Sequence, residues 1–481
     1  MDTFDLAVIG GGTGGLVTAA GAAFLGAKVA LIERDRLGGE CLYTGCVPSK
    51  ALIRSAKVLH LMRRAADFGL NPPEVSFDFA KVMDRMRRVQ QQVGKHDSPE
   101  RFKELGVTLF SDQASFLAPT ELNVGEQRIA AKKVVIATGS RTSIPPIEGL
   151  EEAGFLDHVS AFRLSRLPRS IIILGGGPIG IEFAQILARF GVRVTVLEVV
   201  GQILPREDQE IAQALEAILL AEGIDIHTCT KAFRIEKDGA EKIVHGECTG
   251  LPVRSTQTGA AMTFRAEEIF LATGRRPNVE GLNLEGAGVS YNGKRIIVDE
   301  TLRTTARNIW ACGDVTGKLL FTHVAEYQAR LVVRNALFPF KSKADYSAVP
   351  WCTFTDPEVA RVGLTEAEAR EQFGNVKIYR YNFGDLDRAL CDGEAVGLTK
   401  LVCTPKGKIV GVHILGPQAG DLIQEVVLAM RKRLPVGALS RTIHAYPTLA
   451  EGVRRTADQY YREKLFSGPF KGLLRLLMRI G

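Results

Sequence analysis

The chain has 481 residues, and at about 150 residues per domain this length predicts roughly three domains. Hydrophobic residues make up 46% and charged residues 24% of the chain, which is an ordinary globular composition and excludes collagen-like, disordered and coiled-coil proteins. The net charge of +7 falls far short of the clustered basicity of a nucleic-acid-binding protein, so we expect no nucleic-acid partner.

The eight cysteines are too sparse and too irregularly spaced for a secreted disulfide framework, and no C-x-x-C pair indicates a bound metal. The first residues, MDTFDLAVIGGG, lack the basic region of a signal peptide. No run of about 18 apolar residues predicts a membrane-spanning helix. We therefore expect a protein of a reducing compartment, the cytoplasm, without a metal site.

The first predicted unit is a strand, a glycine turn and a helix in FDLAVIGGGTGG, followed by a second strand in KVALIER. The turn has the spacing Gly10-x-Gly12-x-x-Gly15, with Gly14 inside it, which is typical of turns that hold a dinucleotide pyrophosphate at a helix N-terminus. Glu33, at the end of the second strand, is placed to bind a ribose hydroxyl. This segment therefore predicts a dinucleotide-binding domain.

The same pattern recurs in SIIILGGGPIGIEFAQILARFGVRVTVLE. Gly175, Gly177 and Gly180 repeat the three spaced glycines, and Glu198 repeats the acidic strand end. A carboxylate at that position accepts hydrogen bonds from a free 2′-hydroxyl and repels a 2′-phosphate, so we expect NADH rather than NADPH. Arg206 is close enough in sequence to leave NADPH open.

Three further apolar strands, in KKVVIATG, EEIFLATG and NIWACGDV, end in small-residue turns. The two ATG strands are predicted to return from β-meanders to the two nucleotide-binding units, where bulky side chains would clash. An acid at the third strand end is able to bind a ribityl hydroxyl, and a turn-forming aspartate is the alternative. The candidate cofactor contacts at these strand ends are Thr138, Gly139, Gly274, Arg275, Gly313 and Asp314.

The segment GGECLYTGCVPSKAL contains Cys41 and Cys46. Positions i and i+5 of a continuous helix point about 140° apart, so a bridge between these cysteines requires a break in the helix, which Gly45 provides. Pro48 suits the first turn of a helix that begins just after Cys46. The helix dipole and Lys50 would then stabilise a Cys46 thiolate, as electron transfer requires, whereas two buried structural cysteines are the alternative.

Together these motifs resemble the flavin-dependent pyridine nucleotide-disulfide oxidoreductases, the family of dihydrolipoamide dehydrogenase, glutathione reductase and mercuric reductase. They occur in family order over nearly the whole chain, and VPWCTFTDPEVARVGLTE opens the dimerisation domain. The resemblance implies an α/β fold with two Rossmann-like dinucleotide-binding domains, as in glutathione reductase, and a C-terminal α+β dimerisation domain. The predicted domains are FAD-binding at 1–148 and 277–344, NAD(P)H-binding at 149–276, and dimerisation at 345–481.

The resemblance also implies roles for individual residues. Cys46 would be the thiol next to the flavin of FAD, and Cys41 the interchange thiol that meets the substrate. Lys50 would pair with Glu182 near the flavin ring, and Asp314 would hold the ribityl chain. Electrons would pass in a homodimer from NAD(P)H through FAD and the disulfide to a small-molecule disulfide or a thiol-bound metal ion.

The stretch IHAYPTLAEG departs from two members of the family. In dihydrolipoamide dehydrogenase and glutathione reductase, a histidine from the partner subunit stands five residues before a glutamate and serves as acid and base. Here Tyr446 holds that position before Glu451, and a phenol with a pKa near 10 is a poor base at pH 7. Mercuric reductase also carries a tyrosine there, and soft metal ions prefer thiolate ligands, so we predict a mercuric-reductase-like acceptor.

Three features leave that prediction incomplete. The C-terminal cysteine pair of typical mercuric reductases is missing, since the last cysteine is Cys403. Glu40 and Tyr43 place a charge and a ring beside the redox pair, where family members carry smaller or amide side chains. If HAYPTLAE forms a strand, His444 and Tyr446 project to one side and His444 would serve as a displaced base; a structural histidine is the alternative.

The last 30 residues carry seven basic side chains against two acidic ones, and GPFKGLLRLLMRIG has the pattern of a basic amphipathic helix. Such a helix packs on the chain itself or on the dimer partner, or it contacts a membrane surface. The tail keeps open a membrane-surface flavoprotein that passes electrons to a quinone, and so a peripheral position at the inner membrane face. The functions of a dihydrolipoamide dehydrogenase and of a redox sensor also stay open.

Overall fold

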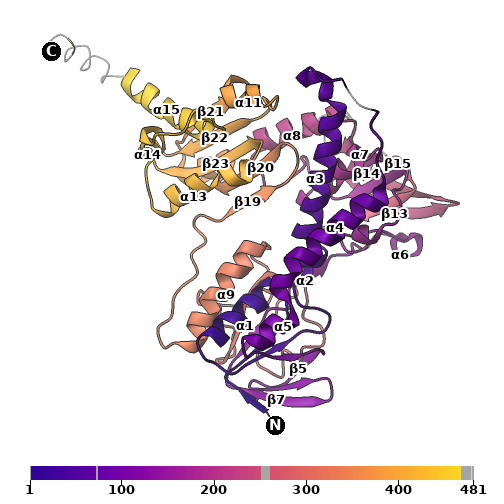
Figure 1. Cartoon of the computed structure of the whole chain (residues 1–481), viewed down its shortest axis with the longest axis vertical. Coiled ribbons are helices and arrows are strands. Elements are labelled where there is room, and N and C mark those ends of the chain that lie inside the picture. The colour runs from indigo at the N-terminus through magenta and orange to yellow at the C-terminus, as the bar shows by residue number, and fades with distance from the viewer. Residues whose placement is uncertain (1, 72–73, 251–260, 467–477, 479–481) are drawn as a thin grey trace.

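The structure, a computed structural model, describes residues 2–71, 74–250, 261–466 and 478. Figure 1 shows three lobes that each contain β-sheet, with two long helices, α3 (Cys46–Arg63) and α4 (Phe79–Gly94), running from the first lobe along the second. The predicted α/β fold class is confirmed. The predicted basic helix of the C-terminal tail lies outside the described residues.

The first lobe, at the N-terminal end of the chain, is built on a five-stranded parallel sheet, and all its strands except β4 are completely buried. Burial on both faces is the usual state of parallel sheets. The last strand to join comes from far along the chain, so two separate stretches of sequence build this sheet. In spatial order the strands are β18 (Ile309–Ala311), β8 (Val134–Ile136), β2 (Leu6–Ile9), β3 (Val29–Ile32) and β4 (Thr108–Phe110).

The second lobe repeats this arrangement with a four-stranded parallel sheet. Its strands, in spatial order, are β12 (Asp225–His227), β11 (Arg193–Leu197), β10 (Ser170–Leu174) and β16 (Glu268–Leu271). The helices that follow β2 and β10 are α1 (Thr13–Phe24) and α7 (Pro178–Arg189). The two predicted strand–turn–helix units are therefore both present.

An antiparallel meander precedes the returning strand of each unit, as the two ATG segments predict. In the first lobe β5 (Ala114–Ala118), β6 (Glu121–Val124) and β7 (Gln127–Ala131) precede β8, and β1 (Asp2–Phe4) extends this sheet. In the second lobe β13 (Thr230–Asp238), β14 (Glu241–Cys248) and β15 (Ala261–Ala266) precede β16. The antiparallel pair β9 (Ser140–Thr142) and β17 (Arg275–Pro277) crosses between the lobes.

Helix α9 (Thr322–Leu337) packs beside α1 on the sheet of the first lobe. A side chain at Gly14 would lie 3.9 Å from Ala325, and one at Gly21 would lie 3.4 Å from Val333. The small residues of α1 therefore let the two helices approach closely while both run in the same direction. Their N-termini point toward the end of the sheet where the glycine turn follows β2.

The third lobe holds a five-stranded antiparallel sheet with helices from the C-terminal part of the chain. Its strands, in spatial order, are β19 (Pro350–Thr353), β20 (Glu358–Gly363), β23 (Ile409–Gly416), β22 (Leu398–Cys403) and β21 (Lys377–Asn382). Its helices are α10 (Glu366–Phe373), α11 (Asp387–Cys391), α12 (Ala419–Leu422), α13 (Gln424–Arg431), α14 (Val436–Arg441) and α15 (Glu451–Phe466).

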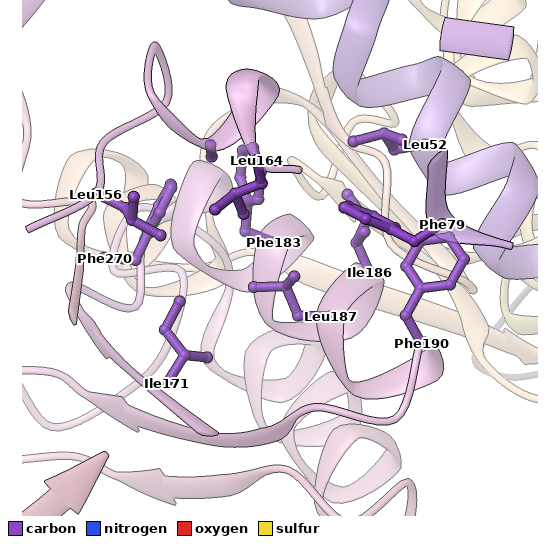
Figure 2. A pocket seen from close by; sticks show the side chains of 11 residues that line it. Leu52, Phe79, Leu156, Leu164, Ile171, Phe183, Ile186, Leu187, Phe190 and Phe270 are labelled. Carbon is purple, nitrogen blue, oxygen red and sulfur yellow. The ribbon is translucent and has the colours of Figure 1, made fainter. Parts of the chain in front are cut away.

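The helices α3 and α4 are joined to the second lobe through an apolar core. Figure 2 shows Phe79 of α4 beside Phe190, with Leu52 of α3 above Ile186 and Phe183 of α7. The cavity among them has a volume of only about 10 Å³, room for no more than about one water molecule, so this junction is packed rather than open to a ligand. The core therefore fixes the segment that carries both cysteines against the second dinucleotide-binding unit.

Among the described residues, no helix is long and apolar enough to cross a bilayer. The remaining α-helices are the short α2 (Gly39–Tyr43), α5 (Pro99–Glu104) and α6 (Leu150–Ala153) and, in the second lobe, the longer α8 (Gln209–Ala221). The expected strand over HAYPTLAE is wrong, because residues 443–450 form an irregular loop between α14 and α15. Among the described residues no strand pairs with this segment, and the sequence pattern alone does not show which strands will be neighbours.

Candidate active site

The two glycine turns have nearly identical backbone geometry. Gly10 has a φ of +109° and Gly175 a φ of +110°, in the region that favours glycine. A side chain at Gly10 would overlap the carbonyl oxygen of Ala137, and one at Gly175 would overlap that of Ala272. The backbone just after the returning strands β8 and β16 therefore contacts the two turns directly, and only glycine fits there.

The second glycine of each turn faces open space instead. Gly12 and Gly177 are the N-cap residues of α1 and α7. A side chain at Gly177 would meet nothing within 4 Å, and one at Gly12 would come within 4 Å only of Gly39, at 3.9 Å. Both residues line the large cleft described below, so each turn leaves a cradle at a helix N-terminus where a pyrophosphate fits.

The acidic strand ends bind the backbone of the same turns. Glu33 accepts a hydrogen bond from the Gly11 amide at 2.6 Å, and Glu198 accepts one from the Gly176 amide, also at 2.6 Å. Glu33 lines the cleft, whereas Glu198 is 9% exposed and does not. The remaining glycines, Gly15 and Gly180, pack directly under the turns, where a side chain would overlap the Gly10 and Gly175 carbonyl oxygens.

A cleft of about 1940 Å³ runs past both turns and the cysteine segment. Its volume is sufficient for two dinucleotides, and it brings together residues from all three lobes. The predicted site residues that line it are Gly10, Gly12, Gly14, Glu33, Cys41, Cys46, Lys50, Thr138, Gly139, Gly177, Glu182, Gly274, Arg275, Gly313 and Asp314. The glycine cradles and polar strand ends therefore fit FAD and NAD(P)H.

The cysteines lie on two helices that meet at a sharp bend. Cys41 belongs to α2, and Cys46 is the first residue of α3, with Gly45 as its N-cap. Gly45 is required for closeness rather than for a positive φ, since a side chain there would lie 2.9 Å from the Glu40 carbonyl oxygen. Both cysteines are free thiols in the structure, and the bend brings Cys46 next to Cys41.

Several groups favour the ionised form of Cys46. Its pKa is lowered to about 6, first by the hydrogen bond from Cys41 and then by the hydrogen bond with Thr322, at 3.5 Å, and by the positive charge of Lys50. Burial has the opposite effect and is outweighed. The hydrogen bond to Cys46 and burial raise the pKa of Cys41. The shared proton therefore stays on Cys41, and Cys46 is the thiolate of the pair at neutral pH.

Lys50 is held in place by a carboxylate from the second lobe. Its Nζ donates to the two carboxylate oxygens of Glu182 at 2.8 and 3.0 Å and lies 4.4 Å from the centre of the Phe354 ring. Glu182 is 6% exposed and also accepts the backbone amide of Phe354 at 2.9 Å. This contact joins the three lobes directly beside the thiol pair.

The low pKa of Cys46 predicts a pH-dependent reactivity. Because the thiolate is the nucleophile, we expect alkylation of Cys46 by iodoacetamide in the reduced protein to rise with pH and reach its half-maximum near pH 6. A Lys50→Met variant removes the nearby positive charge, so its half-maximum is expected at higher pH. Mass spectrometry of the labelled peptide measures both. A midpoint near 8.5 in the folded protein, equal to that of the urea-unfolded chain, would contradict the assignment.

Asp314 and Arg275 form a second polar cluster in the cleft. Asp314 accepts a hydrogen bond from Ser140 at 2.6 Å, and Arg275 Nε donates to the same Ser140 hydroxyl at 2.8 Å. Glu40 forms an ion pair with Arg275 and lies 3.2 Å from the buried ring of His158. The unusual acid before Cys41 therefore binds the β9–β17 crossing and does not approach the sulfurs with a free charge.

The predicted residues of the C-terminal loop lie apart from this cleft in a single chain. Tyr446 is 68% exposed, and its hydroxyl donates to Asp387 at 3.0 Å. The His444 ring is nearly buried and lies 3.0 Å from Glu425, so the two side chains have different partners. Buried Glu451 accepts from Arg454 at 2.7 Å and pairs with no imidazole among the described residues.

The sequence patterns did not identify several residues that line the site. Thr322 contacts Cys46, and beside it the Phe321 ring stacks on both His323 and Trp351. The indole of Trp351 donates at 2.5 Å to buried Glu207, whose pKa is raised by burial. No spacing rule connects these positions, since they come from three separate segments that meet only in the folded chain.

The chain belongs to the pyridine nucleotide-disulphide oxidoreductases. The family model of that name matches residues 4–329, and the model of the family's dimerisation domain matches residues 349–457. The family uses FAD and NAD(P)H, so the cofactors predicted from the glycine turns are confirmed at this level. The chain is therefore an FAD-dependent oxidoreductase with a redox-active cysteine pair and a dimerisation domain.

Relatives with two different activities match nearly the whole chain. A dihydrolipoyl dehydrogenase of Bacillus subtilis is 37% identical over 94% of this chain and 97% of its own length. A mercuric reductase of Streptomyces lividans is 36% identical over 95% of this chain and 96% of its own length. A solved structure, the Cu(II) complex of the HOCl-induced flavoprotein disulfide reductase RclA of Escherichia coli, has a TM-score of 0.85 and 30% identity over 95% of this chain and 100% of that one.

Proposed function

We propose that the protein uses NADH to reduce a soft metal ion held between the thiolates of Cys41 and Cys46. The observation that supports this most is that Glu451 is neutralised by Arg454 and Tyr446 stands where an imidazole would be needed for dithiol exchange. Metal reduction needs no such base, because thiolates bind soft ions directly. Mercuric reductases among the relatives and the Cu(II) complex of a structural neighbour agree with this choice.

NADH supplies two electrons and becomes NAD⁺ with release of one proton, which is enough to reduce one Hg²⁺ to the metal or two Cu²⁺ to Cu⁺. FAD, when bound in the first cradle, would supply the electron carrier between NADH and the thiol pair. This chain contributes a Cys46 thiolate that Lys50 stabilises and a Cys41 thiol that loses its proton when the metal binds. Glu198 favours NADH, since the negative charge at the end of β11 would repel a 2′-phosphate although its side chain does not line the cleft, and Arg206, which does line the cleft, keeps NADPH as the alternative.

We further propose a cytoplasmic homodimer, in which the loop 443–450 of one protomer faces the thiol pair of its partner. The dimerisation domain and the exposed position of Tyr446 support this arrangement. The eight free cysteines of the chain suit a reducing compartment. A fully active monomer in size-exclusion chromatography with light scattering would contradict the dimer.

An acceptor panel tests the metal-reduction proposal. Anaerobic turnover is measured with NADH and with NADPH against Hg²⁺, Cu²⁺, lipoamide, glutathione disulfide and a quinone. We expect the highest kcat/KM for a soft metal ion with NADH, and a gain of at least about tenfold in lipoamide turnover on Tyr446→His, because an imidazole supplies the missing base. Equal or higher lipoamide turnover in the unchanged protein would overturn the proposal, and negligible turnover with every acceptor would indicate a redox sensor.

Dihydrolipoamide dehydrogenase activity is the second candidate, and one contact favours it. Glu425 lies 3.0 Å from Nε2 of the His444 ring, as in a carboxylate–imidazole pair two residues before Tyr446, and Nδ1 lies 3.0 Å from the Thr442 carbonyl oxygen, so proton exchange at Nδ1 requires that the contact to Thr442 opens. If His444 serves as a displaced base, His444→Ala is expected to lower lipoamide turnover by about 10²-fold and to leave metal reduction unchanged. Unchanged lipoamide turnover across pH 6 to 9 would eliminate this candidate.

A further inference from the structure

The far ends of α1 and α9 carry a cluster of exposed apolar side chains. Phe24 is 73% exposed and Leu25 is 55% exposed at the end of α1, while Phe338 and Phe340 are 45% and 78% exposed just after α9. Because α1 and α9 pack side by side in the same direction, these four side chains lie at one end of the first lobe. Clustered large apolar side chains on a surface mark an interaction site.

Basic side chains surround this cluster. Lys28 follows Leu25 by three residues, Arg334 lies in the last turn of α9, and the Nζ atoms of Lys133 and Lys341 donate to backbone carbonyls at the end of α9. In the part of the chain that the structure describes, none of these four cations forms an ion pair with a carboxylate, since the nearby acids pair with other lysines, and the Nζ of Lys28 lies 4.9 Å from the centre of the Phe4 ring. We call these four apolar and four basic side chains the basic–aromatic tip.

The basic–aromatic tip and the cleft lie at opposite ends of the strands of the first sheet. Lys28 immediately precedes β3 and Lys133 immediately precedes β8, whereas the cleft begins at Gly10 and Glu33, after the ends of β2 and β3. Since these strands are parallel, their N-terminal ends lie together at one end of the sheet and their C-terminal ends at the other. A partner bound at the tip would therefore leave the cleft open to cofactors and acceptor.

We infer that the basic–aromatic tip docks the protein on an anionic phospholipid bilayer. Aromatic side chains insert at the headgroup boundary, and lysine and arginine side chains that pair with no carboxylate of the described chain bind the phosphate groups around them. The nearby acids are already neutralised, since Asp5 pairs with Lys132 and Glu300 with Lys343. A second copy of the chain fits poorly, because a symmetric contact would bring identical cations together.

Co-sedimentation with vesicles tests this inference on the full-length holoprotein. Binding is compared between vesicles of phosphatidylcholine alone and vesicles that also contain phosphatidylglycerol. We expect binding only to the anionic vesicles, weakened at least about tenfold both by Phe24→Ser with Phe340→Ser and by Lys28→Glu with Arg334→Glu. The matched controls are Phe233→Ser and Lys237→Glu, which change exposed side chains of β13 in the second lobe and are expected to bind like the unchanged protein.

NADH turnover with a water-soluble acceptor is measured in every variant and is expected to stay unchanged, because the tip lies away from the cleft. Vesicle binding that survives both double variants would overturn the inference, and its loss on deletion of 469–481 would assign it to the tail instead. Equal binding to neutral vesicles would also overturn it. Loss of a higher oligomer in the Phe24→Ser, Phe340→Ser variant, without any vesicle binding in the unchanged protein, would assign the surface to a protein contact.

Discussion

Replacing Cys46 with serine is expected to abolish turnover with every acceptor, by a factor of at least about a thousand, while bound FAD and NADH affinity remain. A serine hydroxyl cannot ionise near neutral pH, so the group whose pKa is lowered to about 6 is lost, and the thiol pair is reduced to Cys41 alone. Under anaerobic conditions, stopped-flow measurement of the flavin absorbance should still show one rapid change when NADH is added. No turnover of the acceptor should follow this change.

The matched control is Cys391→Ser, because Cys391 is an exposed free thiol on α11 outside the cleft. We expect this control to turn over like the unchanged protein. A Cys46→Ser variant that keeps more than about a tenth of the acceptor turnover would show that the thiol pair is not on the path of the electrons. The same outcome for Cys41→Ser would reject only its role as the interchange thiol.

The second large effect is expected at the paired glycine turns. Gly175→Ala places a methyl group against the Ala272 carbonyl oxygen and puts an alanine at a position whose φ is positive. We therefore expect the KM for NADH to rise by at least about a hundredfold while FAD stays bound. Gly10→Ala repeats the change against Ala137 and is expected to yield a protein without FAD. Steady-state kinetics and the flavin absorbance of the purified protein measure the two results.

A third glycine separates the clash from the strained backbone. Gly191 has a φ of +90°, but a side chain there would meet nothing within 4 Å. Gly191→Ala is therefore expected to cost about 1 kcal/mol of stability and to leave the KM for NADH unchanged. If Gly191→Ala and Gly175→Ala raise this KM equally, backbone strain rather than contact with the returning strand explains the effect.

The parts of the fold that sequence predicted share one physical property. Each is set by a local steric requirement, such as the turn at Gly10 and its repeat at Gly175, or by the break that separates Cys41 from Cys46. A local requirement appears as a fixed residue type at a fixed spacing in the sequence. Such a pattern can be recognised without knowing which residues are neighbours in the folded chain. The parallel sheets, the meanders and the start of α3 near Cys46 followed from it.

The expectations that sequence could not fix concern side chains whose partners lie far along the chain. The strand expected over HAYPTLAE was wrong, since residues 444–451 form no strand in the structure, and His444 contacts Glu425 on α13 whereas Tyr446 contacts Asp387 on α11. Glu40 looked like an unbalanced charge beside Cys41, but Arg275 and His158 bind it. Neither partner is marked by a spacing rule.

The sequence by itself determined the class of cofactor and the redox pair of this protein, because glycine turns and a cysteine bend are imposed by covalent geometry over a few residues. Only the tertiary structure decided what surrounds the thiols. Thr322 at the start of α9 contacts Cys46, and Glu182 on α7 binds Lys50, so both contacts join elements that are adjacent in space but not in sequence. The same packing placed four basic side chains at the far ends of α1 and α9 without a carboxylate partner among the described residues, whereas the count of charges along the sequence pointed only to the tail.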